Sequence, residues 1–284
     1  MGRAPVRALA IAIAFVVRGF ASAAEDGNGA GPWHKLETGL ELGVFSAPMR
    51  SQVGDSLVRI VRIDPQRFEL RLLTASAPAQ GRSLTAKEWC QQNGLVAAIN
   101  ASMYQGDYKT SVSLMKTKAH TNNPRVSKDN AILAFDRHDD GVPAVQIIDR
   151  QHQNFDELRP RYGSLVQSIR MVSFDGRNVW QPDTDRASTA AIGIDRQGRV
   201  LFVHVRSPYS THDIVNMLLG LPIDLKNAMY TEGGSEAQLY VRSGSQEFEF
   251  VGWSETGFME IAENAPAWPI PNIIGIARVQ PDSH

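Results

Sequence analysis

Residues 189–205, TAAIGIDRQGRVLFVHV, indicate two strands joined by a tight turn. The apolar runs 189–194 and 200–205 flank the polar tetrapeptide 195–198, DRQG, whose glycine suits a hairpin. The stretch therefore predicts an antiparallel β-hairpin as a principal element of the fold.

Further apolar runs predict strands on both sides of this hairpin. They cover residues 40–44, 57–63, 68–73, 95–99, 131–135, 144–148, 165–169, 227–231, 237–241, 247–251 and 273–279. Residues 40–44, 57–63 and 68–73, the last two joined at Asp64-Pro65, indicate an N-terminal antiparallel meander. Residues 95–99, LVAAI, are apolar throughout, which is typical of a strand buried on both faces.

Helical signals interrupt the strands at a few places. The capping box TAKE, residues 85–88, begins a helix over residues 86–93 that should end at Gly94. Ser210 caps a second helix, and residues 154–159 form a weaker one. Because strands outnumber helices, we expect an α+β fold: a large mixed, mostly antiparallel β-sheet with two or three helices in a single domain.

The composition is that of an ordinary globular protein, with 43% hydrophobic and 21% charged residues. It excludes a wholly disordered chain, a fibrous repeat and a polytopic membrane protein. Lysine and arginine number 29 against 30 acidic residues, so the formal net charge is −1 and we expect no nucleic-acid partner. The single cysteine, Cys90, excludes an intrachain disulfide.

The N-terminus has the features of a secretory signal. Arg3 and Arg7 precede the apolar run 8–17, and small residues at 21–24 offer cleavage sites. This run is too short to cross a bilayer, which needs about 20 residues. An uncleaved anchor and a buried N-terminal helix are the alternatives.

We therefore expect three parts along the chain. They are a signal peptide (1–24), a flexible N-terminal segment (25–38) that is rich in glycine at its start, and the folded domain (39–284). This organisation predicts export to the periplasm or the extracellular space. It also predicts no stable membrane span after the signal is cleaved.

Three polar clusters lie where predicted strands begin or end, which is where folds commonly place ligands. The first starts at Asn100, the second is Arg186, and the third is residues 231–236, TEGGSE. The two glycines of the third cluster would let backbone amides approach an anionic group closely. These clusters predict a polar cleft.

Each cluster also has a purely structural interpretation. Gly233-Gly234 suits a two-residue hairpin turn, and Asn100 could do no more than terminate a strand. Arg186 could pair on the surface with Asp183 or Asp185. Likewise His204, which shares a strand face with Arg206, fits a structural histidine on a half-buried sheet.

Known metal and nucleophile motifs are absent from the sequence, including His-Glu-x-x-His, Gly-x-Ser-x-Gly and the phosphate-binding glycine loop. We therefore expect no cofactor and no metal. A metal-dependent hydrolase with Asp107, Asp183 and Glu232 as oxygen ligands remains an alternative.

Taken in order, four segments resemble the phosphodiester glycosidase family. They are 95–104 (LVAAINASMY), 165–176 (LVQSIRMVSFDG), 186–203 (RASTAAIGIDRQGRVLFV) and 226–241 (KNAMYTEGGSEAQLYV). The family's Asn-x-Gly-aromatic segment corresponds to Asn100 through Tyr104, with Ser102 in the glycine position. Its Asp-Gly-Gly-Gly-Ser-like loop corresponds to residues 232–235, with glutamate in place of aspartate and one glycine fewer.

The resemblance implies hydrolysis of a sugar 1-phosphodiester at the anomeric carbon, with a sugar-phosphate or polysaccharide, such as an exopolysaccharide, as substrate. A phosphate leaving group is already a stable anion and needs no proton from an acid. One carboxylate at the sugar carbon and one cation at the phosphate are therefore sufficient to catalyse the reaction. The implied catalytic residues are Glu232 as base or nucleophile, Arg186 as the phosphate clamp, and Asn100. A non-catalytic polysaccharide- or cell-wall-binding module on the same fold is the alternative function.

The remaining implied site residues bind substrate. Glu236 is a reserve carboxylate, and Tyr104 and Trp253 are candidate sugar platforms. The others would orient phosphate or sugar hydroxyls: Gly233, Gly234, Ser235, Ser102, Gln167 and Ser168.

Overall fold

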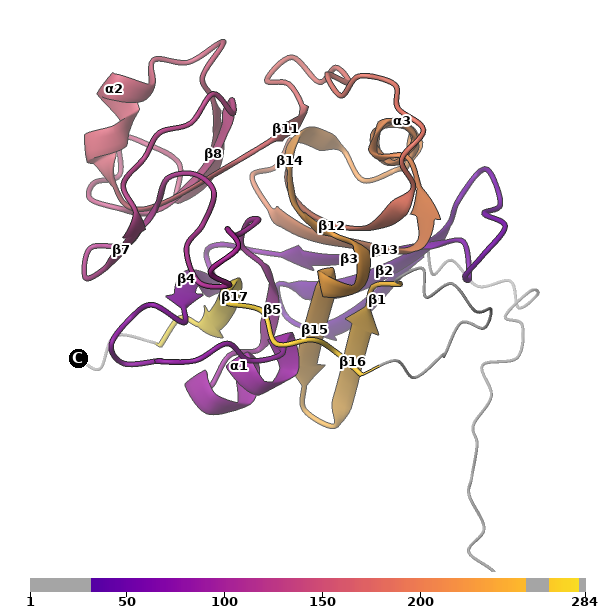
Figure 1. The fold of residues 1–284 in the computed structure, drawn as a ribbon, viewed down its shortest axis with the longest axis horizontal. Coiled ribbons are helices and arrows are strands. Elements are labelled where there is room, and N and C mark those ends of the chain that lie inside the picture. Colours follow the sequence, from indigo (N-terminus) through magenta and orange to yellow (C-terminus); the bar gives the residue numbers. More distant parts are fainter. Residues whose placement is uncertain (1–31, 254–265, 281–284) are drawn as a thin grey trace, which may run out of the picture. The chain divides into compact units, whose positions relative to one another are not determined.

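Antiparallel strands dominate the computed structural model, which describes residues 32–253 and 266–280. The described strands form three sheets, accompanied by three α-helices (Figure 1). This confirms the α+β class with two or three helices, although the single large sheet expected is divided into three. The predicted signal peptide, 1–24, lies outside the described residues.

The seven-stranded sheet has the order β1-β2-β3-β13-β12-β14-β11. Its strands are β1 (Trp33–Glu37), β2 (Leu40–Ser46), β3 (Leu57–Ile63), β13 (Val200–Tyr209), β12 (Ala187–Asp195), β14 (Leu225–Gly233) and β11 (Arg170–Val172). The predicted hairpin is confirmed as β12 and β13. Gly198 takes a positive φ of 82°, and the Asp195 carboxylate accepts the backbone N–H groups of Gln197 and Arg199.

Two five-stranded sheets complete the fold, and we name each by one strand. The β5 sheet has the order β16 (Gln246–Val251), β15 (Gln238–Ser243), β5 (Ala97–Asn100), β17 (Asn272–Arg278) and β4 (Phe68–Thr74). The β8 sheet has the order β7 (Thr121–Asn123), β6 (Met115–Lys116), β10 (Tyr162–Ser168), β8 (Ala131–Arg137) and β9 (Val145–Asp149).

Two expectations about the N-terminal part need correction. The predicted meander forms only in its first half: β2 pairs antiparallel with β3, but β3 continues to β13 while β4 pairs with β17 in another sheet. Part of the segment expected to be flexible, 25–38, is strand β1, which pairs with β2. Trp33 anchors β1, because its ring packs edge-on against Phe45 and beneath the Arg62 guanidinium.

The helices follow their capping signals. In α1 (Ala86–Asn93) both hydrogen bonds of the capping box form, and Gly94 ends the helix in the left-handed conformation. The Ser210 hydroxyl accepts a backbone N–H at the start of α3 (Thr211–Gly220). The weak helix is α2 (Phe155–Leu158), followed by a 3₁₀ turn, η1 (Arg159–Arg161).

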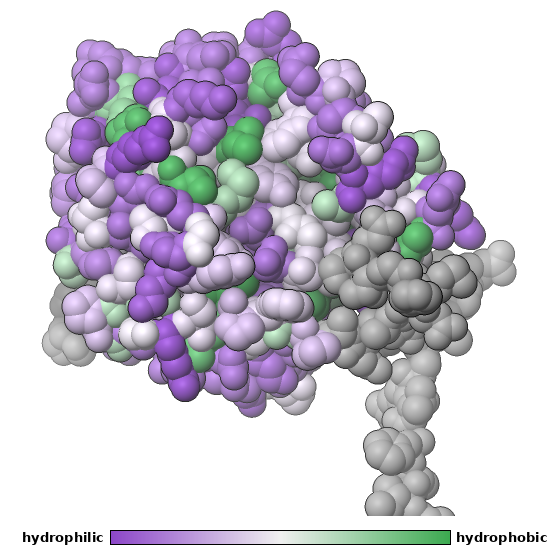
Figure 2. All heavy atoms as spheres, viewed as in Figure 1, coloured by the Kyte–Doolittle hydropathy of each residue, from purple (hydrophilic) through white to green (hydrophobic). Residues whose placement is uncertain are grey.

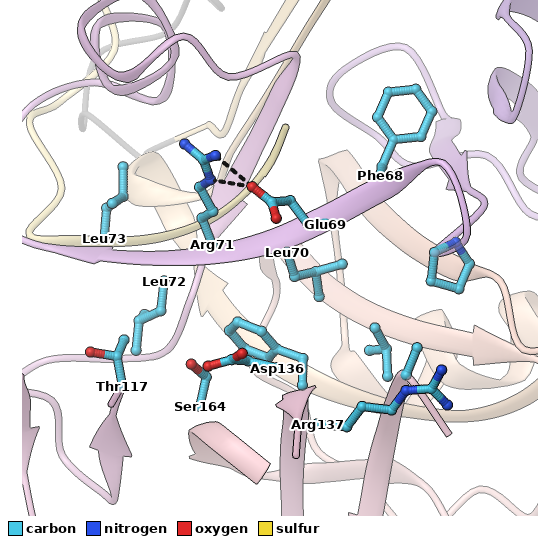
Figure 3. A pocket seen from close by; sticks show the side chains of 14 residues that line it. Phe68, Glu69, Leu70, Arg71, Leu72, Leu73, Thr117, Asp136, Arg137 and Ser164 are labelled. Atoms are coloured by element: carbon cyan, nitrogen blue, oxygen red, sulfur yellow. Dashed lines mark hydrogen bonds and ion pairs between the residues drawn. The ribbon is translucent and has the colours of Figure 1, made fainter. Parts of the chain in front are cut away.

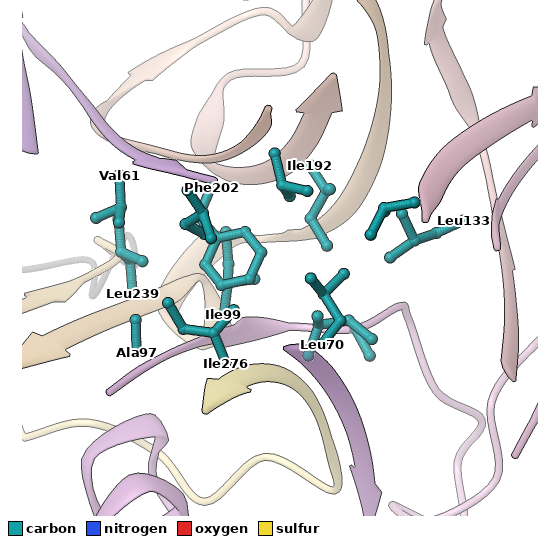
Figure 4. Close-up of a cluster of buried hydrophobic side chains, with 14 of the residues drawn as sticks. Val61, Leu70, Ala97, Ile99, Leu133, Ile192, Phe202, Leu239 and Ile276 are labelled. Atoms are coloured by element: carbon teal, nitrogen blue, oxygen red, sulfur yellow. The ribbon is translucent and has the colours of Figure 1, made fainter. Parts of the chain in front are cut away.

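One apolar core joins all three sheets (Figure 4). Ile192 and Phe202 come from the seven-stranded sheet, Ile99 from the β5 sheet and Leu133 from the β8 sheet. Separate clusters hold α3 against the outer face of the seven-stranded sheet and α1 against the β5 sheet. The three sheets therefore meet around a shared interior, which brings the ends of their strands together.

The surface of the described residues is largely hydrophilic on the face that Figure 2 shows, with small separate hydrophobic spots. No helix in the described ranges has the length and apolarity that a bilayer-crossing segment needs. A cavity of about 500 Å³ lies between β4 and the β8 sheet, and Glu69, Arg71 and Asp136 are among its lining residues (Figure 3). None of the residues predicted for the site lines this cavity.

Candidate active site

Residues from all three sheets meet at one junction. Glu232 ends β14 of the seven-stranded sheet, Asn100 ends β5, and Ser168 ends β10 of the β8 sheet. Because the sheets share one core, these three strand ends converge although they are far apart in sequence. The sequence clusters that the strands carry are thus neighbours in space.

Hydrogen bonds tie the three strand ends together. The Asn100 side chain donates to the Glu236 carbonyl at 2.8 Å and accepts from the Gln238 N–H at 2.7 Å. The backbone N–H of Tyr230 donates to the Ile169 carbonyl at 2.9 Å, which joins β14 to the end of β10. These bonds fix the position of the segment that carries Glu232 and Glu236.

The Ser102 hydroxyl completes the set by donating to the Gln167 carbonyl at 3.2 Å. This bond joins the segment after β5 to β10, and the seven-stranded sheet continues into the β5 sheet through η2, which Asn100 binds. Ser102 is buried, and its backbone N–H donates to the Asn272 side chain at 3.2 Å.

A β-bulge directs Glu232 toward the shared interior. Ala190 pairs with Glu232 and Ala191 with Tyr230, which leaves Thr231 as an extra residue on β14. In a regular strand Tyr230 and Glu232 would share a face. The bulge instead leaves Tyr230 packed with the cluster under α3, while Glu232 joins the face of Ala190, which belongs to the core between the sheets.

Gly233 and Gly234 do not form the two-residue hairpin turn that the sequence allows. The chain passes from β14 into a 3₁₀ turn, η2 (Gly234–Glu236), and then into β15 of a different sheet. Gly234 has a φ of 64°, the left-handed conformation in which glycine costs least. A Cβ on Gly233 would collide with the Tyr230 hydroxyl, so this glycine permits a close approach.

Burial raises the pKa of the Glu232 carboxyl above its usual value. Loss of solvent, opposed by a hydrogen bond from the Gly233 N–H and assisted by the nearby Glu236 carboxylate, raises the pKa of Glu232 to about 7. The Gly233 N–H donates to Glu232 Oε1 at 3.1 Å. A carboxyl group with this pKa exchanges a proton readily near neutral pH, as a general base or acid must.

Two tyrosine side chains lie near the carboxylates of Glu232 and Glu236. Burial, followed by the charges of Glu236 and Glu232, raises the pKa of the Tyr104 phenol. Burial and the same two carboxylates raise the pKa of Tyr230. Both phenols therefore stay protonated as hydrogen-bond donors beside the acidic pair.

The raised pKa of Glu232 predicts a pH-dependent gain in stability for Glu232→Gln. Below the ordinary pKa of 4.5, both the folded and the unfolded carboxyl are protonated, so the group contributes nothing. Between 4.5 and about 7 the unfolded chain ionises first, which destabilises the folded protein progressively. Urea unfolding at pH 8 should therefore show the variant more stable than the wild type by about 3 kcal/mol, with little difference at pH 4.

Glu69→Gln is the control, because Glu69 lies on strand β4 with half of its side chain exposed. An equal gain in stability at pH 4 and pH 8 for Glu232→Gln would contradict the burial of an ionising carboxyl.

Arg186 lies beside this junction without contacting it. It precedes β12, three residues before Thr189, which pairs with Gly233. Its side chain is exposed, and within residues 32–253 and 266–280 it forms no hydrogen bond or ion pair, including with Asp183 or Asp185. The structure therefore leaves the guanidinium available to an anion.

The structure gives Gln167 a different task from the substrate contact expected. Its Nε2 donates to the carbonyls of Ser127 and Asp129, and its Oε1 accepts from the Leu114 and Ser127 N–H groups. Because Gln167 is fully buried, these bonds hold the loop before β8. The adjacent Ser168 is buried too, and its hydroxyl has no partner among the described residues.

Asn100 likewise holds a loop in place, the segment of η2 that carries Glu236. Its side-chain N–H donates to the Glu236 carbonyl, its side-chain oxygen accepts from the Gln238 N–H, and only 2% of the residue is exposed. We predict that Asn100→Ala destabilises the fold by about 3 kcal/mol, because a buried N–H and a buried C=O lose their partner. It should also lower turnover about 10²-fold by displacing η2 and the two carboxylates. Thermal unfolding and kcat/KM for sugar release measure the two effects.

Asn93→Ala is the matched control, since the Asn93 amide donates to the Trp89 carbonyl at the end of α1. It should cost stability and leave turnover unchanged. Equal loss of turnover in both variants would contradict the positioning role of Asn100.

The alternative metal site is not assembled. The Asp107 carboxylate accepts the Lys109 and Thr110 N–H groups within its own exposed loop, and Asp183 accepts the Trp180 indole N–H. In the part of the chain that the structure describes, no three histidine, cysteine or acidic side chains are grouped closely enough to hold a metal ion.

Sequence reasoning missed Tyr230 and the bulge at Thr231. Nothing in the strand-like run 227–231 marks Tyr230 as a site residue, because its approach to Gly233 depends on the bulge. Trp253, a candidate platform, has its backbone N–H bound to the Ser188 hydroxyl at 2.6 Å. Ser235 lies in η2, between Gly234 and Glu236.

Comparisons with known proteins identify a matching family model and two similar folds. The sequence model of the family described as phosphodiester glycosidase matches residues 93–277. The fold is similar to the catalytic domain of zebrafish N-acetylglucosamine-1-phosphodiester alpha-N-acetylglucosaminidase auto-inhibited by its pro-peptide, with a TM-score of 0.60 and 14% identity over 86% of this chain and 85% of that one. It is also similar to a hypothetical protein from Synechocystis, with a TM-score of 0.58 and 15% identity over 88% and 64% of the two chains. No curated protein sequence matches the chain.

Proposed function

The chain belongs to the phosphodiester glycosidase family, a family of hydrolases, and from this premise we propose that it is an exported enzyme that hydrolyses a sugar 1-phosphodiester at the anomeric carbon. The substrate class is a sugar phosphate or a polysaccharide that carries such a linkage. The observation that carries the proposal is the pair Glu232 and Glu236, held together at the junction of three sheets with the pKa of Glu232 raised to about 7.

In the proposed reaction Glu232 acts as the general base. It takes a proton from water as the water oxygen bonds to the anomeric carbon, and the bond from that carbon to the phosphate oxygen breaks. The products are the free sugar and a phosphate monoester. No acid is required for the leaving group, because the departing phosphate is a stable anion.

Arg186 is the proposed clamp for the phosphate. Its exposed guanidinium precedes β12, beside the strand that ends in Glu232 and Gly233. A planar guanidinium can donate two parallel hydrogen bonds to phosphate oxygens and neutralise the leaving group. Ser235 and the Gly234 amide lie in η2, where they are proposed to orient phosphate or sugar hydroxyls.

Tyr104 and Glu236 are proposed to bind the sugar. The Tyr104 phenol lies close enough to Glu236 and Glu232 for their charges to raise its pKa, and the Glu236 charge likewise acts on Glu232. A protonated phenol and a carboxylate together offer a donor and an acceptor, which suits a sugar hydroxyl.

The pH dependence of turnover tests the role of Glu232. As a base it must be ionised, so kcat/KM should rise about tenfold per pH unit below pH 7 and level off above it. Because the Glu236 charge helps to raise the pKa of Glu232, Glu236→Gln should move the midpoint of this rise to lower pH. A flat profile from pH 5 to 8, or an unchanged midpoint in Glu236→Gln, would exclude Glu232 as the base.

The experiment that tests the function is incubation of the purified chain with a sugar 1-phosphodiester, followed by ³¹P NMR. A new phosphate-monoester signal together with free sugar supports the enzyme. Saturable glycan binding without turnover would instead support a non-catalytic binding module. Export is tested separately, by N-terminal sequencing of the chain recovered outside the cytoplasm, which should begin at residue 24 or 25.

A further inference from the structure

An exposed tyrosine lies next to the candidate active site. Tyr108 is 67% exposed, more than any other exposed large hydrophobic side chain in the described part of the chain. Its ring centroid is 5.8 Å from that of Tyr104, with the two ring planes tilted by 47°, which is an ordinary aromatic contact. Tyr104 in turn lies close enough to Glu236 and Glu232 to feel their charges. The two rings therefore form an aromatic surface that extends from the carboxylates to solvent.

A short hairpin-like loop presents Tyr108. Tyr104 and Ser111 pair as an isolated antiparallel bridge, and residues 105–110 form the loop between them. The Tyr108 N–H donates to the Gln105 carbonyl at 3.0 Å, which closes a turn at the tip of the loop. The buried end of this loop thus carries the tyrosine near the carboxylates, and its tip carries the exposed one.

Hydrogen bonds on both sides of Tyr108 hold the loop in one conformation. The Asp107 carboxylate accepts the Lys109 and Thr110 N–H groups at 3.0 and 2.9 Å. From outside the loop, the Asn122 side chain of β7 donates to the Lys109 carbonyl at 2.9 Å. A loop that is already ordered loses little conformational entropy when a ligand binds to it.

The backbone conformation at Tyr108 is unfavourable for a tyrosine. Its φ of 54° lies in the left-handed region, where a Cβ is disfavoured and glycine is the residue that costs least. Since two thirds of the side chain is exposed, packing within the described residues offsets little of this cost. The stability of the loop therefore gives no reason for a tyrosine here, whereas a ligand that covers the ring would give one.

The two rings have the chemistry that a sugar ring requires. A pyranose has an apolar face of C–H groups and a rim of hydroxyls. Tyrosine offers a large, rigid and amphipathic contact surface with little entropy to lose. The exposed side chains of Gln105 and Lys109 lie near Tyr108 in the loop and carry an acceptor and a donor that suit sugar hydroxyls.

We propose that Tyr104 and Tyr108 form an aromatic platform for a second sugar ring, next to the sugar that reacts at Glu232, so that the substrate is an oligosaccharide or a polysaccharide. The position of the platform favours a glycan over a protein partner, because it begins at the tyrosine beside the two carboxylates. The choice of a sugar as ligand rests on the proposed function. The platform itself concerns binding and requires no turnover.

NMR of ¹³C-labelled tyrosine rings tests the platform directly. The protein is titrated with chitotriose, cellotriose and maltotriose, and separately with the monosaccharides N-acetylglucosamine and glucose. The signal missing from Tyr108→Phe identifies Tyr108. We expect saturable displacement of this signal by at least one trisaccharide, with a Kd at least about tenfold below that of its monosaccharide, because only the longer chain reaches both the platform and the carboxylates.

Variants of Tyr108 separate binding from folding, with calorimetry as the measure of affinity. Tyr108→Gly should weaken trisaccharide binding at least about tenfold and leave the melting temperature no lower, because glycine suits the left-handed backbone. Tyr108→Phe keeps the ring face and should bind within about threefold of the wild type. Phe174→Ala is the matched control, because Phe174 is also an exposed aromatic residue but stacks on His152 instead.

Absence of saturable displacement by all three trisaccharides would overturn the proposal, as would equal affinity for trisaccharide and monosaccharide. Wild-type binding by Tyr108→Gly, or a loss in Phe174→Ala as large as in Tyr108→Gly, would overturn it too. The outcome is separable from that of the proposed function. Trisaccharide binding without hydrolysis of any sugar 1-phosphodiester would support the platform and refute the enzyme, whereas hydrolysis of a single-sugar 1-phosphodiester without such binding would do the reverse.

Discussion

Glu232→Gln is expected to lower kcat/KM for sugar release from a sugar 1-phosphodiester by about 10³-fold, the usual contribution of a positioned general base. The amide cannot accept the proton from water, yet it keeps the acceptor that binds the Gly233 N–H. The fold should therefore persist, with greater stability above pH 7 than the wild type. Activity and unfolding then change in opposite directions, which a general loss of structure cannot produce.

The matched control for this prediction is Glu69→Gln. Glu69 lies on β4 and is ion-paired to Arg71 on the same strand at 2.5 Å. Its substitution should leave kcat/KM within about twofold of the wild type. Turnover of Glu232→Gln at the wild-type rate would remove Glu232 from the mechanism.

Arg186→Ala is expected to lower kcat/KM about 10²-fold, equivalent to about 3 kcal/mol of transition-state stabilisation. The reason is that charge accumulates on the departing phosphate, where the guanidinium would neutralise it. Because Arg186 forms no bond within the described residues, its removal should leave the melting temperature unchanged. Activity measured against substrate concentration separates an effect on kcat from one on KM.

Two further variants sharpen the test of Arg186. Arg177→Ala removes another exposed arginine, one paired with Asp175, and should leave turnover unchanged. Arg186→Lys keeps the charge without the paired donors, so it should restore only part of the activity. Full activity in Arg186→Ala would assign the phosphate to other groups.

Local signals in the sequence were sufficient to predict the elements that are stabilised by hydrogen bonds between residues close together in the chain. The capping box at Thr85 and Glu88 predicted α1 with its observed ends, and the turn at residues 195–198 predicted the β12–β13 hairpin. Both depend on hydrogen bonds between residues at most four positions apart. Such short-range hydrogen bonds can be predicted from a single sequence, because both partners lie within a few residues of each other.

Local signals could not predict which strands pair when the strands are far apart in the sequence. Residues 57–63 and 68–73 are adjacent and apolar, which predicts a meander, yet β3 and β4 enter different sheets. Gly233-Gly234 fits a hairpin equally well by composition but leads from one sheet to another. In both cases the choice depends on partners more than 100 residues away, β13 for β3 and β5 for β15.

For the candidate site too, local signals predicted some features, and others depend on long-range contacts. Its polar clusters were identified from strand ends, and their convergence at one junction is the feature that the structure adds. The tasks of Gln167 and Asn100 could not be predicted, because each depends on backbone groups in loops distant along the chain. The direction of the Glu232 side chain depends on the bulge at Thr231, which has no signal in the residue types.

The most direct test of the account is hydrolysis of a sugar 1-phosphodiester in ¹⁸O-labelled water, with both products examined by mass spectrometry. Attack at the anomeric carbon, as proposed for water activated by Glu232, places the label in the sugar hydroxyl and leaves the phosphate monoester unlabelled. Label in the phosphate would mean that the phosphorus–oxygen bond breaks instead. That result would contradict the glycosidase chemistry on which the account depends.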